Sequence, residues 1–200
     1  MPTSILIAFQ YTTKPLPGAL IDLYHAMKWC LSFQCKPHIL TDITSVQNLS
    51  NLKQAIDTKI ADDDLLNFFN VELFGNPIRN SIQLLEKIVT ILNEPISDKK
   101  LILYYSGHGI REYMIMPDNG RLPFIEFRDH IIRMVPPDVE IFWILDCCNP
   151  NGLYLPYKLQ GNTFRLSSSK IQCVTHPILL ITSSDSDEKS IATKSGSLKY

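Results

Sequence analysis

The chain has 200 residues, of which 45% are hydrophobic and 20% charged, a composition that excludes a disordered chain and fits one globular domain. The 19 basic and 20 acidic side chains leave a net charge of −1, which excludes a general positive field for nucleic acid or anionic lipid. The 5 cysteines are an odd number, and we find neither a membrane-length apolar run nor a signal peptide. We therefore expect a soluble, reduced, cytoplasmic protein that binds neither nucleic acid nor membrane.

Apolar strands alternate with helical segments along the chain. Continuous apolar runs, typical of buried parallel strands, are Ser4–Phe9, Pro37–Leu40, Leu101–Tyr105, Ile141–Leu145 and Ile178–Ile181. Helical spacing of apolar residues predicts helices over Leu20–Leu31, Thr44–Ile60, Ile82–Leu92 and Pro123–Met134, with a further helix after Asp62–Asp64. Tyr113–Met116 is expected to be extended before a turn at Pro117–Gly120, and Asn149–Gln172 is expected to be a long exposed loop. This order predicts an α/β fold with a mainly parallel central sheet and helices on both faces.

Two polar clusters follow buried strands at the point where each strand ends. His108 lies between two glycines after Leu101–Tyr105, and Cys148 follows Ile141–Leu145. Because ligands of parallel α/β sheets bind beyond the carboxyl ends of the strands, we expect both side chains at one edge. A nearby histidine raises the thiolate fraction of a cysteine, as nucleophilic catalysis requires. Singly, each residue type is more often structural, but the pair at two strand ends favours a catalytic dyad.

These clusters resemble the histidine and cysteine motifs of the caspase-like cysteine peptidases. The motifs that carry the resemblance are Tyr104-Tyr105-Ser106-Gly107-His108-Gly109 and Leu145-Asp146-Cys147-Cys148. They are closer to paracaspases and metacaspases than to caspases, whose cysteine motif begins Gln-Ala-Cys. Weaker matches extend the resemblance over most of the chain: Ile5–Phe9, Pro17–Tyr24, Thr182–Glu188 and Ser195-Gly196.

The resemblance implies one peptidase domain over residues 1–200, folded as a caspase-like three-layer sandwich. Residues 1–148 would correspond to the large subunit, 149–176 to a linker and active-site loop, and 177–200 to part of the small subunit. The last helix and strand of the family do not follow Ser195-Gly196, so the small-subunit region is expected to be truncated at the C-terminus. We therefore expect a monomer or a non-standard oligomer.

The same resemblance gives each motif residue an expected role. Cys148 would be the nucleophile, because the family pattern Asp-x-Cys leaves Cys147 at the variable position. His108 would be the general base and acid. The backbone N–H groups of Gly109 and Cys148 would form the oxyanion hole.

The resemblance also assigns acidic residues to the substrate pocket, and their charge predicts the class of substrate. The positions that match the substrate-binding S1 pocket of the family are Asp22, Ser106, Asp146 and Glu188. Carboxylates in one pocket favour a guanidinium, which pairs with two oxygens and keeps its charge when desolvated. We therefore expect a cysteine endopeptidase without a cofactor that cleaves protein substrates after Arg or Lys. Self-cleavage is then expected in the linker, after Lys158, Arg165 or Lys170.

Other features depart from the family pattern or leave an alternative open. Asn149–Gly152 replaces the His-Ser-Gly that metacaspases usually have. Neither an acidic calcium-binding insertion nor a fourth zinc ligand beside Cys30, Cys35 and His38 is evident, so no metal is expected. The truncated small-subunit region supports a second interpretation, a catalytically inactive caspase-like decoy or scaffold that binds a partner peptidase or adaptor.

Overall fold

The computed structural model describes residues 1–16, 18–42, 77–148, 153, 155, 157–160, 163–166 and 175–183. The helices predicted over Thr44–Ile60 and after Asp62–Asp64 lie outside these residues. So do Asn149–Gly152, Glu188 and most of the predicted small-subunit-like region.

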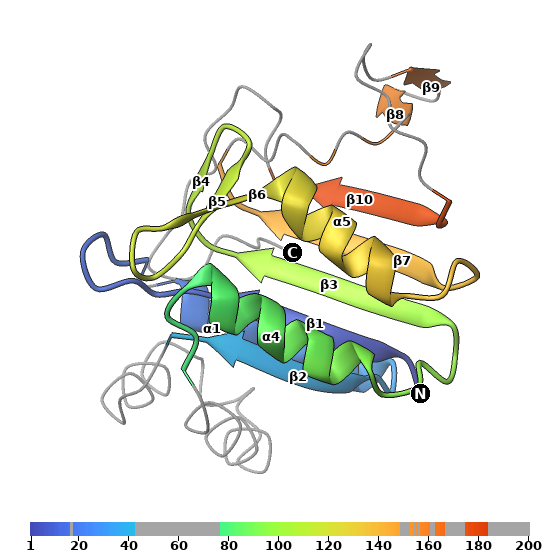
Figure 1. The fold of residues 1–200 in the computed structure, drawn as a ribbon, viewed down its shortest axis with the longest axis horizontal. Coiled ribbons are helices and arrows are strands. Elements are labelled where there is room, and N and C mark those ends of the chain that lie inside the picture. Colours follow the sequence, from blue (N-terminus) through green and yellow to red (C-terminus); the bar gives the residue numbers. More distant parts are fainter. Residues whose placement is uncertain are drawn as a thin grey trace.

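Parallel strands form the central sheet. They are β1 (Thr3–Ala8), β2 (Lys36–Thr41), β3 (Lys100–Ser106), β7 (Glu140–Asp146) and β10 (Ile178–Thr182). Their spatial order is β10-β7-β3-β1-β2, and every neighbouring pair is parallel (Figure 1). All of β1 is buried, and so is β3 after its first residue, because both faces of these strands are covered. The predicted mainly parallel sheet is confirmed.

Helices cover both faces of this sheet (Figure 1). They are α1 (Ala19–Ser32) on one face, and α4 (Ser81–Leu92) and α5 (Phe124–Met134) on the other. Successive residues of a strand point to opposite faces, so they enter different apolar clusters. Leu6 belongs to the cluster of Leu23 on α1, whereas Ile7 belongs to the cluster of Leu84 on α4 and Phe127 on α5. The predicted three layers of helix, sheet and helix are confirmed.

Two small antiparallel sheets complete the described architecture. They consist of β4 (Gly109–Ile110), β5 (Tyr113–Ile115) and β6 (Arg121–Pro123), and of β8 (Tyr157–Gln160) and β9 (Thr163–Leu166). The extended segment at β5 and the turn after it are confirmed, and Asn119 in that turn has φ 66°. The long loop predicted over Asn149–Gln172 is wrong in part, because β8 and β9 pair as a hairpin with Gln160 opposite Thr163.

The carboxyl ends of the central strands meet at one edge of the sheet. Ser106 at the end of β3 is aligned with Ala8 of β1 on one side and with Asp146 of β7 on the other. From β1, the chain continues to β2 on one side and then to β3 on the opposite side, so the strand order reverses between β1 and β3. Open parallel sheets bind ligands at such a reversal, outside the carboxyl ends. The segments that begin with Gly107 and Cys147, and that carry His108 and Cys148, leave the sheet at this edge.

Candidate active site

His108 follows β3 closely and is held through both its main chain and its ring. Its N–H donates to the Tyr11 hydroxyl (2.8 Å), and its carbonyl accepts from the Tyr105 hydroxyl (2.8 Å). The imidazole lies against the Tyr11 ring, with 4.6 Å between the ring centroids. Its Nε2 is 2.7 Å from the Lys14 carbonyl oxygen. These contacts hold the half-buried ring in one orientation at the carboxyl edge.

The contact with Lys14 determines which nitrogen of His108 carries the proton. A carbonyl oxygen can only accept a hydrogen bond, so Nε2 must be the donor. In the neutral ring, Nδ1 then holds the lone pair and is the nitrogen that can accept a proton. This tautomer suits a general base, because the atom that orients the ring and the atom that takes the proton are on opposite sides.

The glycine after His108 lies directly against the main chain of the cysteine motif. A Cβ atom at Gly109 would come well inside 3.0 Å of the Cys148 carbonyl oxygen, closer than real Cβ atoms approach, and within 3.1 Å of the Cys147 sulfur. Only a residue without a side chain fits here. Since Gly109 is bonded to His108 and touches Cys148, the structure brings the two predicted motifs together.

The two adjacent cysteines differ in exposure. Cys147 is 1% exposed and belongs to the apolar cluster on the α5 side of the sheet. Burial raises the pKa of its thiol far above the usual range, and the neighbouring Asp146 and Cys148 add to the shift. Cys148 is only half-buried. Of the two, Cys148 is therefore the side chain that a ligand can reach.

Three of the four predicted S1 residues form a buried polar cluster at the same edge. Asp22 in the first turn of α1, Ser106 and Asp146 are 2%, 3% and 4% exposed. The Ser106 hydroxyl donates to Asp22 Oδ2 (3.3 Å), and Ser106 is the register partner of Asp146 on the next strand. Two carboxylates thus lie around one serine. Glu188, the fourth predicted residue, lies outside the described residues.

Sequence reasoning did not find the groups that hold His108. Tyr105 belongs to the histidine motif, but its residue type and position indicate only a buried strand. Tyr11 and Lys14 lie 97 and 94 positions from His108, so no local pattern connects them with it. Lys14 acts through its carbonyl oxygen, a group that every residue has. Only the fold identifies these partners.

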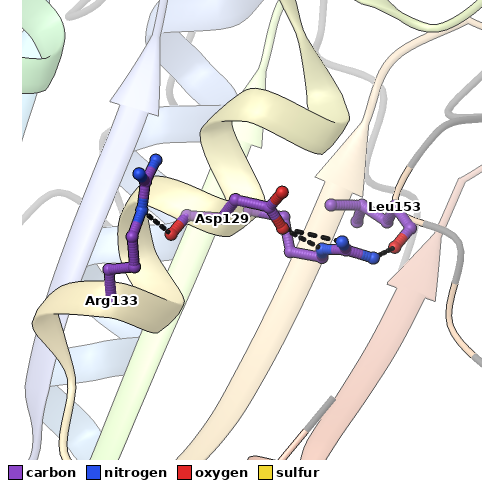
Figure 2. A network of polar contacts seen from close by, with 4 residues as sticks. Asp129, Arg133 and Leu153 are labelled. Carbon is purple, nitrogen blue, oxygen red and sulfur yellow. Dashed lines mark hydrogen bonds and ion pairs between the residues drawn. The ribbon is translucent and has the colours of Figure 1, made fainter. Parts of the chain in front are cut away.

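A buried arginine, Arg128, anchors the segment that follows the cysteine motif, and Figure 2 shows its partners Asp129 and Leu153. Arg128 of α5 is 2% exposed, and its Nη1 donates to the Leu153 carbonyl oxygen at 2.6 Å. Asp129 Oδ1 accepts from the same guanidinium at 2.9 and 2.7 Å, and the Asp129 carbonyl accepts from Arg133 Nε at 3.0 Å. The sequence does not indicate this contact, because Leu153 participates through its main-chain carbonyl, a group that every residue has.

The other end of the predicted linker is tied to the end of the same helix. His176 is 8% exposed, and its Nε2 lies 2.9 Å from the carbonyl oxygen of Val135, which caps α5. Because Leu153 is bound to Arg128, both ends of the linker are attached to α5 and the residue after it. Leu153 and His176 therefore both lie beside α5 or the residue that caps it.

The described ranges contain neither a metal cluster nor a membrane-length helix. Within them, no group of three or more His, Cys, Asp or Glu side chains could hold a metal ion. Cys30 and Cys35, considered above as zinc ligands, are buried free thiols, and burial raises the pKa of Cys30 to about 11. No helix in the described part of the chain is long and apolar enough to cross a membrane.

Comparison with known proteins gives a likeness in structure and none in sequence. No protein-family model and no curated protein matches the sequence. Among solved structures, the chain is similar to caspase-1 from Spodoptera frugiperda, with a TM-score of 0.62 and 13% identity. The likeness covers 98% of this chain, which spans 64% of the length of that caspase chain. At this identity the comparison shows the fold, so the central sheet and its helices form a caspase-like α/β fold.

Proposed function

We propose that this protein is a cysteine endopeptidase in which Cys148 is the nucleophile and His108 the general base. The observation that carries the proposal is the contact of Gly109 with Cys148, which joins the histidine and cysteine motifs at the carboxyl edge of the sheet. The orientation of His108 by the Lys14 carbonyl supports its role as a base. The caspase-like fold agrees with this chemistry.

The proposed reaction is acyl transfer through a thioester. Nδ1 of His108 takes the thiol proton of Cys148 while Nε2–H stays on the Lys14 carbonyl, and the sulfur attacks the carbonyl carbon of the scissile bond. The imidazolium gives this proton to the leaving amine, and the C–N bond breaks to leave a thioester on Cys148. A water molecule, deprotonated by the same Nδ1, then attacks the thioester. The carboxylic acid leaves, and the proton returns to the sulfur.

The hairpin after His108 supports Gly109 as a donor to the developing oxyanion. Gly109 pairs with Met114 across β4 and β5, and the neighbouring Ile115 N–H donates to the His108 carbonyl at 3.0 Å. His108 and Ile115 are therefore a hydrogen-bonded pair. Because hydrogen-bonded and non-hydrogen-bonded pairs alternate along an antiparallel ladder, the next pair, Gly109 and Met114, is non-hydrogen-bonded. The Gly109 N–H is therefore directed out of the hairpin. With the N–H of Cys148 it forms the proposed oxyanion hole, where one donor contributes about 10²–10³-fold to kcat.

The buried acids support Arg or Lys as the residue that precedes the cleaved bond. Asp22 and Asp146 are almost completely removed from water, and a cation that enters between them gains more from each carboxylate than it would at the surface. Ser106 donates to Asp22 and holds that carboxylate in place. The proposed specificity is that of the paracaspase and metacaspase branches of the family. Glu188 is proposed as a third acid from the sequence resemblance alone.

The test uses purified protein with fluorogenic peptides that end in Arg, Lys or Asp at P1. We expect cleavage after Arg and Lys, no cleavage after Asp, and complete loss of activity in Cys148→Ala. An Arg-ketone affinity label should attach to Cys148, which peptide mapping by mass spectrometry identifies. If no peptide is cut and the label does not attach, the enzyme proposal is wrong and the inactive decoy or scaffold replaces it.

A charge variant tests the specificity separately from the chemistry. Asp146→Asn keeps the size of the side chain and removes its charge, so we expect kcat/KM for the Arg peptide to fall at least about tenfold, as for a lost charge-assisted contact. The matched control is Asp138→Asn, an exposed acid before β7, at the opposite edge of the sheet. Equal kcat/KM in Asp146→Asn and wild type would exclude Asp146 from the pocket.

A further inference from the structure

A tyrosine hydroxyl interrupts the hairpin ladder at His108. The register of β4 with β5, continued by one residue, sets His108 opposite Ile115. One bond of this pair is direct, from the Ile115 N–H to the His108 carbonyl at 3.0 Å. The other passes through Tyr11: the His108 N–H donates to the Tyr11 hydroxyl at 2.8 Å, and that hydroxyl donates to the Ile115 carbonyl at 2.9 Å. One oxygen from the segment after β1 thus replaces a ladder hydrogen bond at the proposed base.

The same tyrosine also sets the plane of the imidazole. The Tyr11 and His108 rings are inclined at 36° with 4.6 Å between their centroids, and Tyr11 is only 4% exposed. Burial raises the pKa of Tyr11 far above its usual range, so the phenol keeps the hydrogen that it donates to Ile115. The Tyr105 hydroxyl lies 3.2 Å from that of Tyr11 and holds the His108 carbonyl. Tyr11 therefore contacts both the main chain and the ring of His108.

The backbone of Tyr11 is strained, and a carboxylate stabilises it. Tyr11 has φ 59°, in the left-handed region that residues other than glycine rarely adopt. Asp42, which directly follows β2, accepts from the Gln10 N–H at 2.7 Å and from the Tyr11 N–H at 2.8 Å through its two oxygens. Strain of this kind persists where the surroundings determine the conformation, and it is common at functional sites.

We propose that Tyr11, held by Asp42, is a positioning residue for His108, an inference that rests on the proposed peptidase function. Tyr11 acts through His108 and sets the direction in which Nδ1 points. Without the hydroxyl, the His108 N–H and the Ile115 carbonyl must pair directly, which moves His108, or through a water molecule, which holds it less firmly than a side chain of the fold. Catalysis is sensitive to such movement, since a displacement of about 1 Å can cost about a hundredfold in rate.

The test compares Tyr11→Phe, which loses only the hydroxyl, with a matched variant of the same hairpin. Tyr113→Phe is the control, because Tyr113 is half-buried on β5 and its ring faces Arg121 rather than His108. The first readout is kcat and KM for the Arg peptide. The second is the rate at which iodoacetamide alkylates Cys148 from about pH 5 to about pH 9, because a thiolate supported by a histidine reacts at lower pH than a free thiol. Melting temperatures show that each variant is folded.

We expect Tyr11→Phe to lower kcat about ten- to a hundredfold with KM changed by no more than about twofold. Its alkylation profile should move toward that of His108→Ala. Asp42→Ala should change both readouts in the same direction, because it releases the strained turn that presents Tyr11. Tyr113→Phe should match wild type within about twofold in both, as expected for a substitution away from the site.

The outcomes separate this inference from the proposed function. If Tyr11→Phe keeps the wild-type kcat and alkylation profile, the positioning role is wrong and the peptidase proposal stands. A lower kcat and melting temperature with an unchanged profile would make Tyr11 merely structural and also overturn the inference. If wild type cuts no peptide, the profile alone decides the role of Tyr11. If wild type and His108→Ala have the same profile, there is no dyad, and both proposals fail.

Discussion

Gly109→Ala is the substitution that most directly tests the contact between the two motifs. The new Cβ would lie well inside 3.0 Å of the Cys148 carbonyl oxygen, and the Cys147 sulfur and Cβ, at 3.1 and 3.3 Å, close the neighbouring directions. The main chain of Cys148 must therefore move by about 1 Å, which predicts a loss of about a hundredfold in kcat. Overpacking of this kind costs about 1–3 kcal/mol. At about 2–4 °C per kcal/mol for a chain of this size, the melting temperature should fall by roughly 2–12 °C.

The assay measures thermal unfolding and kcat for the Arg peptide in Gly109→Ala and in a matched glycine variant. Gly120→Ala is the control, because its Cβ would meet Asp118 Oδ1 at 2.8 Å, the end of a side chain that can rotate away. We expect the control to differ from wild type by no more than about 2 °C in melting temperature and twofold in kcat. If Gly109→Ala melts and cleaves like wild type, Gly109 and Cys148 are not in contact, and the argument for a shared site fails.

Three further predictions concern the helix α5, a buried thiol and the linker. Arg128→Met leaves a buried carbonyl without its donor and should lower the free energy of unfolding by about 1–3 kcal/mol. The control Arg133→Met, at an exposed position, should change it by less than about 0.5 kcal/mol. Equal urea denaturation curves for the two variants would contradict this prediction. Burial raises the pKa of Cys30 from 9.0 to about 11. As the pH rises, this thiol therefore ionises first in the unfolded chain, and the stability that it contributes below pH 9.0 is lost as the pH rises through about 11. Cys30→Ala should therefore flatten the alkaline fall of the unfolding free energy, and an unchanged slope would show that this thiol is not perturbed. Self-cleavage after the basic linker residues predicts smaller fragments for wild type than for Cys148→Ala after incubation, and identical intact masses would exclude it.

The inner strands β1 and β3 were predictable because both of their faces are buried. A strand such as Leu101–Tyr105 needs an apolar side chain at every position, and the observed β3 extends this run by one residue at each end. The shorter strands β4 and β6 were missed, since two or three residues carry no measurable periodicity and depend on pairing with β5. The β8–β9 hairpin had a signal that was not used, the Gly161-Asn162 pair between two segments of alternating polarity.

The candidate site was predictable to the extent that its residues end strands. His108, Ser106 and Asp146 follow or close apolar runs, and parallel strands bring their carboxyl ends to one edge. Asp22 required the resemblance, and in the structure its carboxylate accepts a hydrogen bond from Ser106. Arg128 was missed, because a charged residue in a helix is usually exposed, and its buried position depends on the carbonyl that it binds.

The sequence by itself determined the α/β class, the strands of the sheet and the two motifs at its carboxyl edge. These follow from the order of apolar and polar residues, because burial acts on each side chain according to its own chemistry. The tertiary structure alone decided which groups surround His108. Tyr11, Lys14 and Tyr105 hold it through hydroxyl and carbonyl groups that become partners only when β1, β3 and the β4–β5 hairpin are in register. A hydrogen bond depends on distance and direction between two groups, and no property of either residue alone contains that geometry.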